Sequence, residues 1–135
     1  MITDKQVLFF ETFGFVMLRQ FFSPAEVRVV NTEFIQRLES VYRDQPFDGK
    51  TRQGASFMGP DTPFLASLMQ DERFVSMTKQ LYGEDFIGGS IGGDRYVAHT
   101  HWHPDVNAVH EGGPKIAFYL DPINGESGAL RVIPR

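Results

Sequence analysis

Apolar residues recur at helical spacing in three segments before residue 84, and each segment begins with a helix-start signal. The first follows a capping box at residues 3–6 and ends at Gly14. The second follows a capping box at residues 23–26, with Pro24 at the first helical position, and predicts an amphipathic helix over residues 24–43. The third begins at Asp71 and ends at Gly83. The chain is therefore expected to begin with helices.

The period of the pattern changes to two after Gly83, which is typical of strands. Strands are predicted at residues 86–87, around residue 91, and over 95–102, 115–120 and 129–133, with a short earlier one over 15–18. Between residues 44 and 70, glycine and proline interrupt any long element and indicate a loop of the kind that often carries function. Helices before strands predict an α+β fold with an antiparallel sheet.

Length and composition narrow the class of protein. The 135 residues suit a single domain, 1–135, with 41% hydrophobic and 22% charged residues. The net charge is −4 and no run of Lys or Arg occurs, which argues against a nucleic-acid partner. The absence of cysteine excludes disulfides and thiolate metal sites, and no apolar stretch has membrane-spanning length. We therefore expect a cytoplasmic location with no membrane partner.

The candidate chemistry lies in the segment His-Thr-His-Trp-His-Pro-Asp at residues 99–105. In an extended strand His99, His101, His103 and Asp105 would project to one face. Buried histidine and carboxylate groups need partners, and a metal ion supplies them. A solvated polar strand face explains the same pattern, since four histidines is an ordinary number for this length. The imidazole and carboxylate ligands suit Fe(II), Mn(II) or Zn(II).

Two kinds of metal site fit this segment. The first is the facial triad of two histidines and one carboxylate, in which His103 and Asp105 form H-x-D and a distant histidine completes the set. The second is H-x-H-x-D, formed by His101, His103 and Asp105, which looks like the hydrolytic zinc site of the metallo-β-lactamase fold. That motif continues with a further histidine where this chain has Val106.

Four segments in order resemble the phytanoyl-CoA dioxygenase family. They cover nearly the whole chain: FETFGFVML and FFSPAEV at residues 10–18 and 21–27; DERFV and LYG at 71–75 and 81–83; YVAHTHWHPD at 96–105; KIAFYLDP and GALRVIP at 115–122 and 128–134. The H-x-D motif alone is weak, but its order among the other segments makes the resemblance specific. The resemblance implies N-terminal helices packed on an antiparallel double-stranded β-helix, the jelly-roll or cupin-like fold.

The resemblance also implies an activity and two iron ligands. Family members are Fe(II)- and 2-oxoglutarate-dependent oxygenases that use O2 to hydroxylate a small organic substrate, and His103 and Asp105 match their clustered ligands. The third ligand and the arginine that binds the far carboxylate of 2-oxoglutarate have no match. A jelly roll needs eight strands, and the 52 residues after Gly83 (135 − 83) hold four or five. We therefore expect a truncated, incomplete barrel.

Four further residues are supporting candidates. Lys115 and Tyr119 would share a strand face and contact 2-oxoglutarate or a substrate carboxylate, although a solvated lysine and a core tyrosine explain the same pattern. His99 and His101 are candidates for contacts behind the metal ligands. A non-enzymatic alternative stays open: an inactive or regulatory dioxygenase-like domain that a partner chain completes, or a homo-oligomer formed through an open sheet edge.

Overall fold

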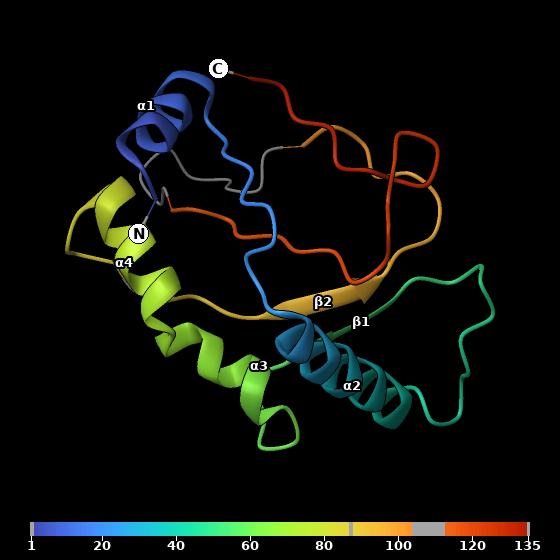
Figure 1. The fold of residues 1–135 in the computed structure, drawn as a ribbon. Helices are drawn as coiled ribbons and strands as arrows, with labels where there is room; N and C mark the ends of the chain where they lie inside the picture. The colour runs from blue at the N-terminus through green and yellow to red at the C-terminus, as the bar shows by residue number, and fades with distance from the viewer. Residues whose placement is uncertain (1, 87, 104–112, 135) are drawn as a thin grey trace. The chain divides into compact units, whose positions relative to one another are not determined.

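The computed structural model describes residues 2–86, 88–103 and 113–134, and it contains helices and a two-stranded sheet (Figure 1). The helices and strands, in chain order, are α1 (Asp4–Phe13), α2 (Pro24–Val41), β1 (Gln53–Ser56), α3 (Pro63–Ser67), the 3-10 helix η1 (Leu68–Gln70), α4 (Glu72–Tyr82) and β2 (Gly92–Arg95). The chain divides into two compact units. Unit 1 comprises Met1–Phe21, Glu72–Phe86 and Trp102–Arg135, and unit 2 comprises Phe22–Asp71 and Ile87–His101.

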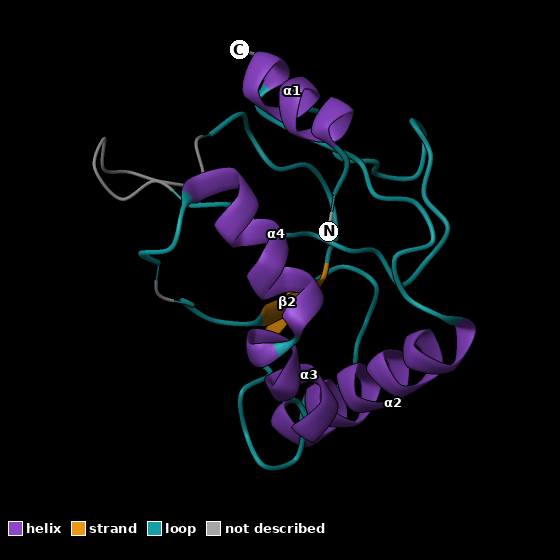
Figure 2. Ribbon diagram, turned by 60° about the vertical axis from the view of Figure 1, so that its left-hand side comes forward, coloured by secondary structure: helices purple, strands orange, loops and turns teal. Residues whose placement is uncertain are grey.

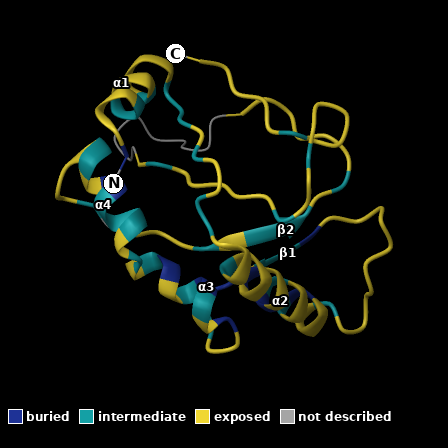
Figure 3. Ribbon diagram, viewed as in Figure 1, coloured by how far each residue is buried: buried dark blue, intermediate teal, exposed yellow. Residues whose placement is uncertain are grey.

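Unit 2 is built on the antiparallel pairing of β1 with β2, in which Gln53 faces Arg95 and Ser56 faces Gly92. Phe34 from α2 stacks on Phe57 with ring centroids 5.3 Å apart. Both rings lie against Gly93, where the absence of a side chain lets them approach the sheet. The buried hydrophobic residues of this unit come from α2, α3, η1 and the residue that follows β1: Val30, Leu38, Phe57, Leu65 and Leu68 (Figure 3).

The start of α2 matches its sequence signal. Ser23 accepts a hydrogen bond from the backbone N–H of Glu26, and the Glu26 carboxylate accepts one from the backbone N–H of Ser23 at 2.8 Å. This reciprocal box pairs two backbone donors that a helix leaves without partners. At the other end, the Tyr42 hydroxyl both donates to the carbonyl and accepts from the N–H of Gly54 in β1, which ties the helix to the sheet.

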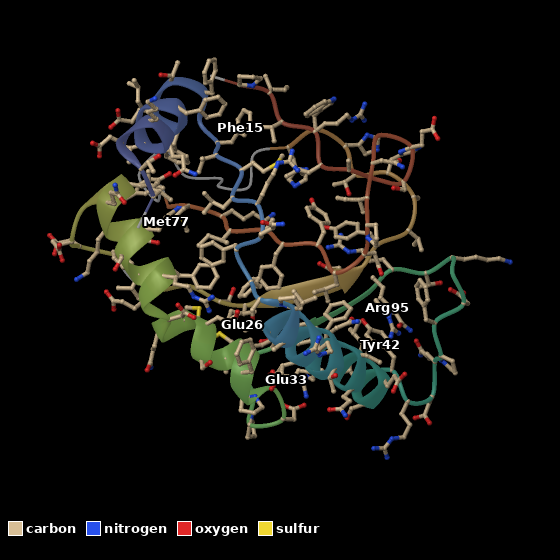
Figure 4. The ribbon with its side chains drawn as sticks, viewed as in Figure 1. Phe15, Glu26, Glu33, Tyr42, Met77 and Arg95 are labelled. Atoms are coloured by element: carbon tan, nitrogen blue, oxygen red, sulfur yellow. The ribbon has the colours of Figure 1, made fainter. Side chains whose placement is uncertain are left out.

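The short helix α3 begins with an unusual cap. Its N-cap residue, Thr62, makes no side-chain capping bond. Instead Glu33, buried on α2 with 8% of its surface exposed, accepts hydrogen bonds from the N–H groups of Phe64 and Leu65, both at 2.9 Å (Figure 4). A carboxylate at a helix N-terminus is electrostatically favourable. Glu33 therefore joins α2 to backbone groups of α3 that lie about thirty residues further along the chain.

Unit 1 contains α1 and α4. The capping box of Thr3 with Gln6 begins α1, and Gly14, with φ +78°, ends it in the left-handed conformation. Ile2 and Met77 are its buried hydrophobic residues in the described ranges. The Gln80 side-chain amide of α4 donates to the Ile2 carbonyl at 2.9 Å, so the N-terminal segment is held against this helix.

All three predicted helices are confirmed as α1, α2 and α4, with α2 ending at Val41, two residues before the predicted end. Gly83 follows α4 with φ +91°, as the pattern predicted. The prediction of a loop throughout residues 44–70 was wrong, because β1, α3 and η1 lie there. Pro63 occupies the first turn of α3, where its missing N–H costs nothing.

The predicted strands mostly do not form (Figure 2). In the described part of the chain, residues 15–18, 115–120 and 129–133 are irregular, so those strand predictions were wrong, and of the strand predicted over 95–102 only Arg95 lies in β2. Residues 86 and 91 are also irregular, and residue 87 lies outside the described residues. Ala98 has a φ of +64°, a left-handed conformation that interrupts an extended strand. The structure is mixed helix and sheet, with a sheet of only two short strands in the described residues. The jelly roll stays a prediction.

Candidate metal-binding segment and groove

Residues 99–103 of the histidine segment follow β2 as an irregular, solvent-exposed stretch of chain. His99 and His101 are exposed in unit 2, and His103 is exposed at the beginning of the last segment of unit 1. Since the strand predicted over residues 95–102 does not continue past Arg95, no strand places these imidazoles on one face. The grouping of these imidazoles by strand alternation was therefore wrong for the described residues, and the roles of His99, His101 and His103 at a metal site stay predictions.

The chemistry of the expected donors fits Fe(II), because imidazole nitrogen and carboxylate oxygen are the ligands of a facial triad. Asp105 lies outside the described residues. Across residues 2–86, 88–103 and 113–134, no three His, Cys, Asp or Glu side chains gather into a group that could hold a metal ion. The described residues thus supply His103 as a candidate ligand, while the metal site as a whole stays a prediction.

The remaining candidates lie in irregular chain of unit 1. Lys115 and Tyr119 are exposed, with half of the Tyr119 surface open to solvent. The strand that would have aligned them is not present, so their shared face is not supported. Trp102 is 59% exposed, and the Arg131 guanidinium lies 5.4 Å from its ring centroid. Such contacts between arginine and an indole face are weakly favourable.

A groove at the end of α2 was missed by the sequence reasoning. It has a volume of about 320 Å³ and is lined by side chains from α2, from the segment after it and from both strands. Leu38, Pro46 and Phe47 supply apolar surface. Gln53 and Arg95 come from the paired strands, where they face each other. The lining positions are scattered from residue 38 to residue 95, so no motif in the sequence could have indicated the groove.

Hydrogen bonds hold the polar side of this groove. Gln53 is buried with 4% exposure, and its amide donates to the carbonyl of Gln45 at 2.8 Å. The Gln53 side-chain oxygen accepts from Arg95 at 3.3 Å, and the Arg95 guanidinium lies 5.5 Å from the Phe47 ring centroid. Tyr42, which follows the last residue of α2, lines the same groove, and Figure 4 shows it beside Arg95 at the end of β2. We call this feature the Arg95 groove.

Nearby charged residues are paired differently. Arg52 forms two contacts with Asp94, at 3.0 Å and 2.9 Å, and its guanidinium lies 4.0 Å from the Tyr96 ring centroid. The hydrogen bond to Asp94 raises the pKa of Arg52 above its already high value. Asp48 accepts from the backbone N–H groups of Lys50 and Thr51, and these bonds lower the pKa of its carboxyl.

Comparisons with models of protein families, with the curated proteins and with solved structures find no match for this chain. The resemblance to the phytanoyl-CoA dioxygenase family therefore rests on the sequence motifs. In the described part of the chain, no helix is both long and apolar enough to cross a membrane.

Proposed function

We propose that this chain carries part of the iron site of a non-haem Fe(II)- and 2-oxoglutarate-dependent oxygenase, with His103 and Asp105 as two ligands. The observation that carries the proposal is the H-x-D motif at residues 103–105, placed in order among the other three segments that resemble the family. Bound Fe(II) and 2-oxoglutarate would supply the oxidising chemistry for hydroxylation of a small organic substrate by O2, while the protein orients the reactants and excludes water.

The roles of the chain's own residues follow from the donor set. The His103 imidazole and the Asp105 carboxylate would each bind the metal through one side-chain donor, which leaves positions for the keto acid and for O2. His101 would contribute at most through contacts behind the ligands, and Lys115 and Tyr119 through contacts with a bound carboxylate. The expected cytoplasmic location stays a prediction.

An anaerobic titration tests the proposal. The full chain receives Fe(II) with and without 2-oxoglutarate, and the weak visible charge-transfer band of the chelated keto acid is followed. Saturable Fe(II) binding and the band are expected for the natural sequence. Both should be lost in His103→Ala and in Asp105→Ala. A chain that binds no Fe(II), or whose binding survives both substitutions, would contradict the proposal.

His101 distinguishes iron from zinc chemistry. In the iron site His101→Ala should weaken metal binding by at most about tenfold, the lower range for loss of a group behind the ligands. In an H-x-H-x-D zinc site His101 is a ligand, so His101→Ala would be as damaging as His103→Ala. His99→Ala is the comparison variant, because His99 lies in the same segment but outside the H-x-H-x-D motif. In the iron site His99→Ala should have no larger effect than His101→Ala, and in the zinc site it should be far less damaging than His101→Ala. Tight zinc binding that requires His101 would contradict the oxygenase proposal and favour a zinc hydrolase.

A further inference from the structure

The Arg95 groove contains a half-buried arginine that has no acidic partner in the described part of the chain. Its hydrogen bond there is to a neutral amide, the Gln53 oxygen at 3.3 Å. Two other arginines near this sheet form ion pairs with acids: Arg52 with Asp94 at 2.9 Å and Arg37 with Asp61 at 2.8 Å. A guanidinium has five donors in a fixed fork, so most of those on Arg95 are available to a ligand in the groove.

The Arg95 side chain is also held in place before any ligand arrives. Gln53, which accepts its hydrogen bond, is buried and is itself fixed by the bond to the carbonyl of Gln45. Phe47 packs against the guanidinium on another side. An arginine fixed in this way loses less conformational entropy on binding than one on a free surface, which favours affinity for a small ligand.

The charges of the groove select the kind of anion. Arg43 adds a second cation to the lining, and Glu39 adds one acid that forms no ion pair with either arginine in the described residues. The side chains therefore carry a net charge of +1. The C-terminal end of α2 contributes roughly half a negative charge. The remaining positive field suits a single carboxylate better than a phosphate or a dicarboxylate.

The apolar wall selects the body of the ligand. Leu38 is fully buried beneath the groove, and Pro46 and Phe47 line it. A volume of about 320 Å³ lies at the small end of ligand pockets. We propose that the Arg95 groove binds a small monocarboxylate with an aromatic or aliphatic body, whose carboxylate pairs with the Arg95 fork and whose body covers Phe47 and Pro46. The pairing uses two parallel charge-assisted hydrogen bonds.

The inference does not depend on the iron proposal. All lining residues belong to unit 2, and none of them is an expected metal ligand or a keto-acid contact. If the chain failed to bind Fe(II), the groove proposal would still stand. If the groove bound no benzoate, the proposal for the H-x-D motif would still stand.

The experiment is a titration of the full chain with benzoate, followed by NMR shifts of the Gln53 side-chain amide and the Arg95 guanidinium N–H. A saturable shift at both groups is expected, with affinity falling by about tenfold in Arg95→Gln, the loss expected for one charge-assisted pair. Arg43→Gln, at an exposed position that does not support the fold, should weaken binding by roughly threefold through the loss of one partly screened charge. Far-UV circular dichroism checks that each variant is folded.

Arg28→Gln is the matched control, because it removes the same charge from an exposed position on α2 that does not line the groove. It should leave benzoate affinity unchanged. The proposal is overturned if the natural sequence shows no saturable shift, or if folded Arg95→Gln binds benzoate as tightly as the natural sequence. It is also overturned if inorganic phosphate or 2-oxoglutarate binds this groove as tightly as benzoate.

Discussion

Replacing Glu33 should destabilise unit 2 more than any other exchange of a charged side chain on α2. Glu33 is 8% exposed, and its carboxylate accepts two backbone N–H bonds at 2.9 Å, from Phe64 and Leu65. Thr62, the N-cap residue of α3, makes no capping bond, and the described part of the chain offers no other side-chain cap. Loss of this carboxylate would therefore leave two backbone donors without partners in a poorly hydrated position.

The magnitude follows from these two bonds. In Glu33→Gln the amide oxygen still accepts one N–H, while the NH2 group cannot accept the other. One lost charge-assisted bond, with one unpaired donor, costs about 2 kcal/mol. For a chain of 135 residues this lowers the melting temperature by about 7 °C. Glu33→Ala loses both bonds and leaves a cavity, so it should cost about 4 kcal/mol.

Urea unfolding followed by far-UV circular dichroism measures the change. The control is Glu39→Gln, the same substitution on an exposed face of the same helix, which should change the free energy of unfolding by less than about 0.5 kcal/mol. The capping role of Glu33 would be refuted if Glu33→Gln were as stable as Glu39→Gln. The free energy of unfolding should fall least in Glu39→Gln, more in Glu33→Gln and most in Glu33→Ala.

Three further predictions concern local contacts. Gly93→Ala would place a methyl group 2.9 Å and 3.0 Å from two phenylalanine rings and should cost about 2 kcal/mol in urea unfolding, whereas Gly89→Ala meets nothing within 4 Å and should be nearly neutral. Ser23→Ala removes the hydroxyl of the α2 capping box and should cost about 1 kcal/mol by the same measurement, with the Glu26 bond at 2.8 Å retained. The N–H bonds from Lys50 and Thr51 lower the pKa of Asp48 below 3.8, so its ionised form stabilises the fold above that pH, and this contribution is lost as the pH falls through the folded pKa. Asp48→Asn should therefore lose less stability than the natural sequence when the free energy of unfolding is measured at falling pH. An unchanged dependence of stability on acid pH would contradict the role of Asp48.

The helices could be predicted because their signals are local. Each capping box lies within four residues, and the structure forms both as expected, at Thr3 with Gln6 and at Ser23 with Glu26. Gly14 and Gly83 mark helix ends for a reason equally local, since both adopt positive φ. Signals of this kind depend little on what the rest of the chain does.

The sheet could not be predicted in the same way, because its pairing is not local. Gln53 and Arg95 are 42 residues apart and face each other. The segment 53–56 is rich in small and polar residues and gives no strand pattern, yet it pairs. Residues 115–120 have a strand pattern and no strand forms. Alternating hydrophobicity favours a strand only where a partner edge is available, and that availability depends on the tertiary fold.

The buried polar residues of unit 2 explain why the Arg95 groove could not be predicted from the sequence. Glu33 and Gln53 are both buried, and each makes its hydrogen bonds to groups distant in the chain: α3 for Glu33, and Gln45 and Arg95 for Gln53. A buried polar group without such partners would be strongly unfavourable, so these bonds fix where α3 and Arg95 lie. The orientation of the guanidinium in the groove is thus a consequence of packing Gln53 inside the unit. A Gln53→Leu exchange would keep the volume and remove both bonds. It should weaken benzoate binding, followed at the Arg95 guanidinium N–H, because the guanidinium is no longer held in place, although neither the charge nor the apolar wall has changed.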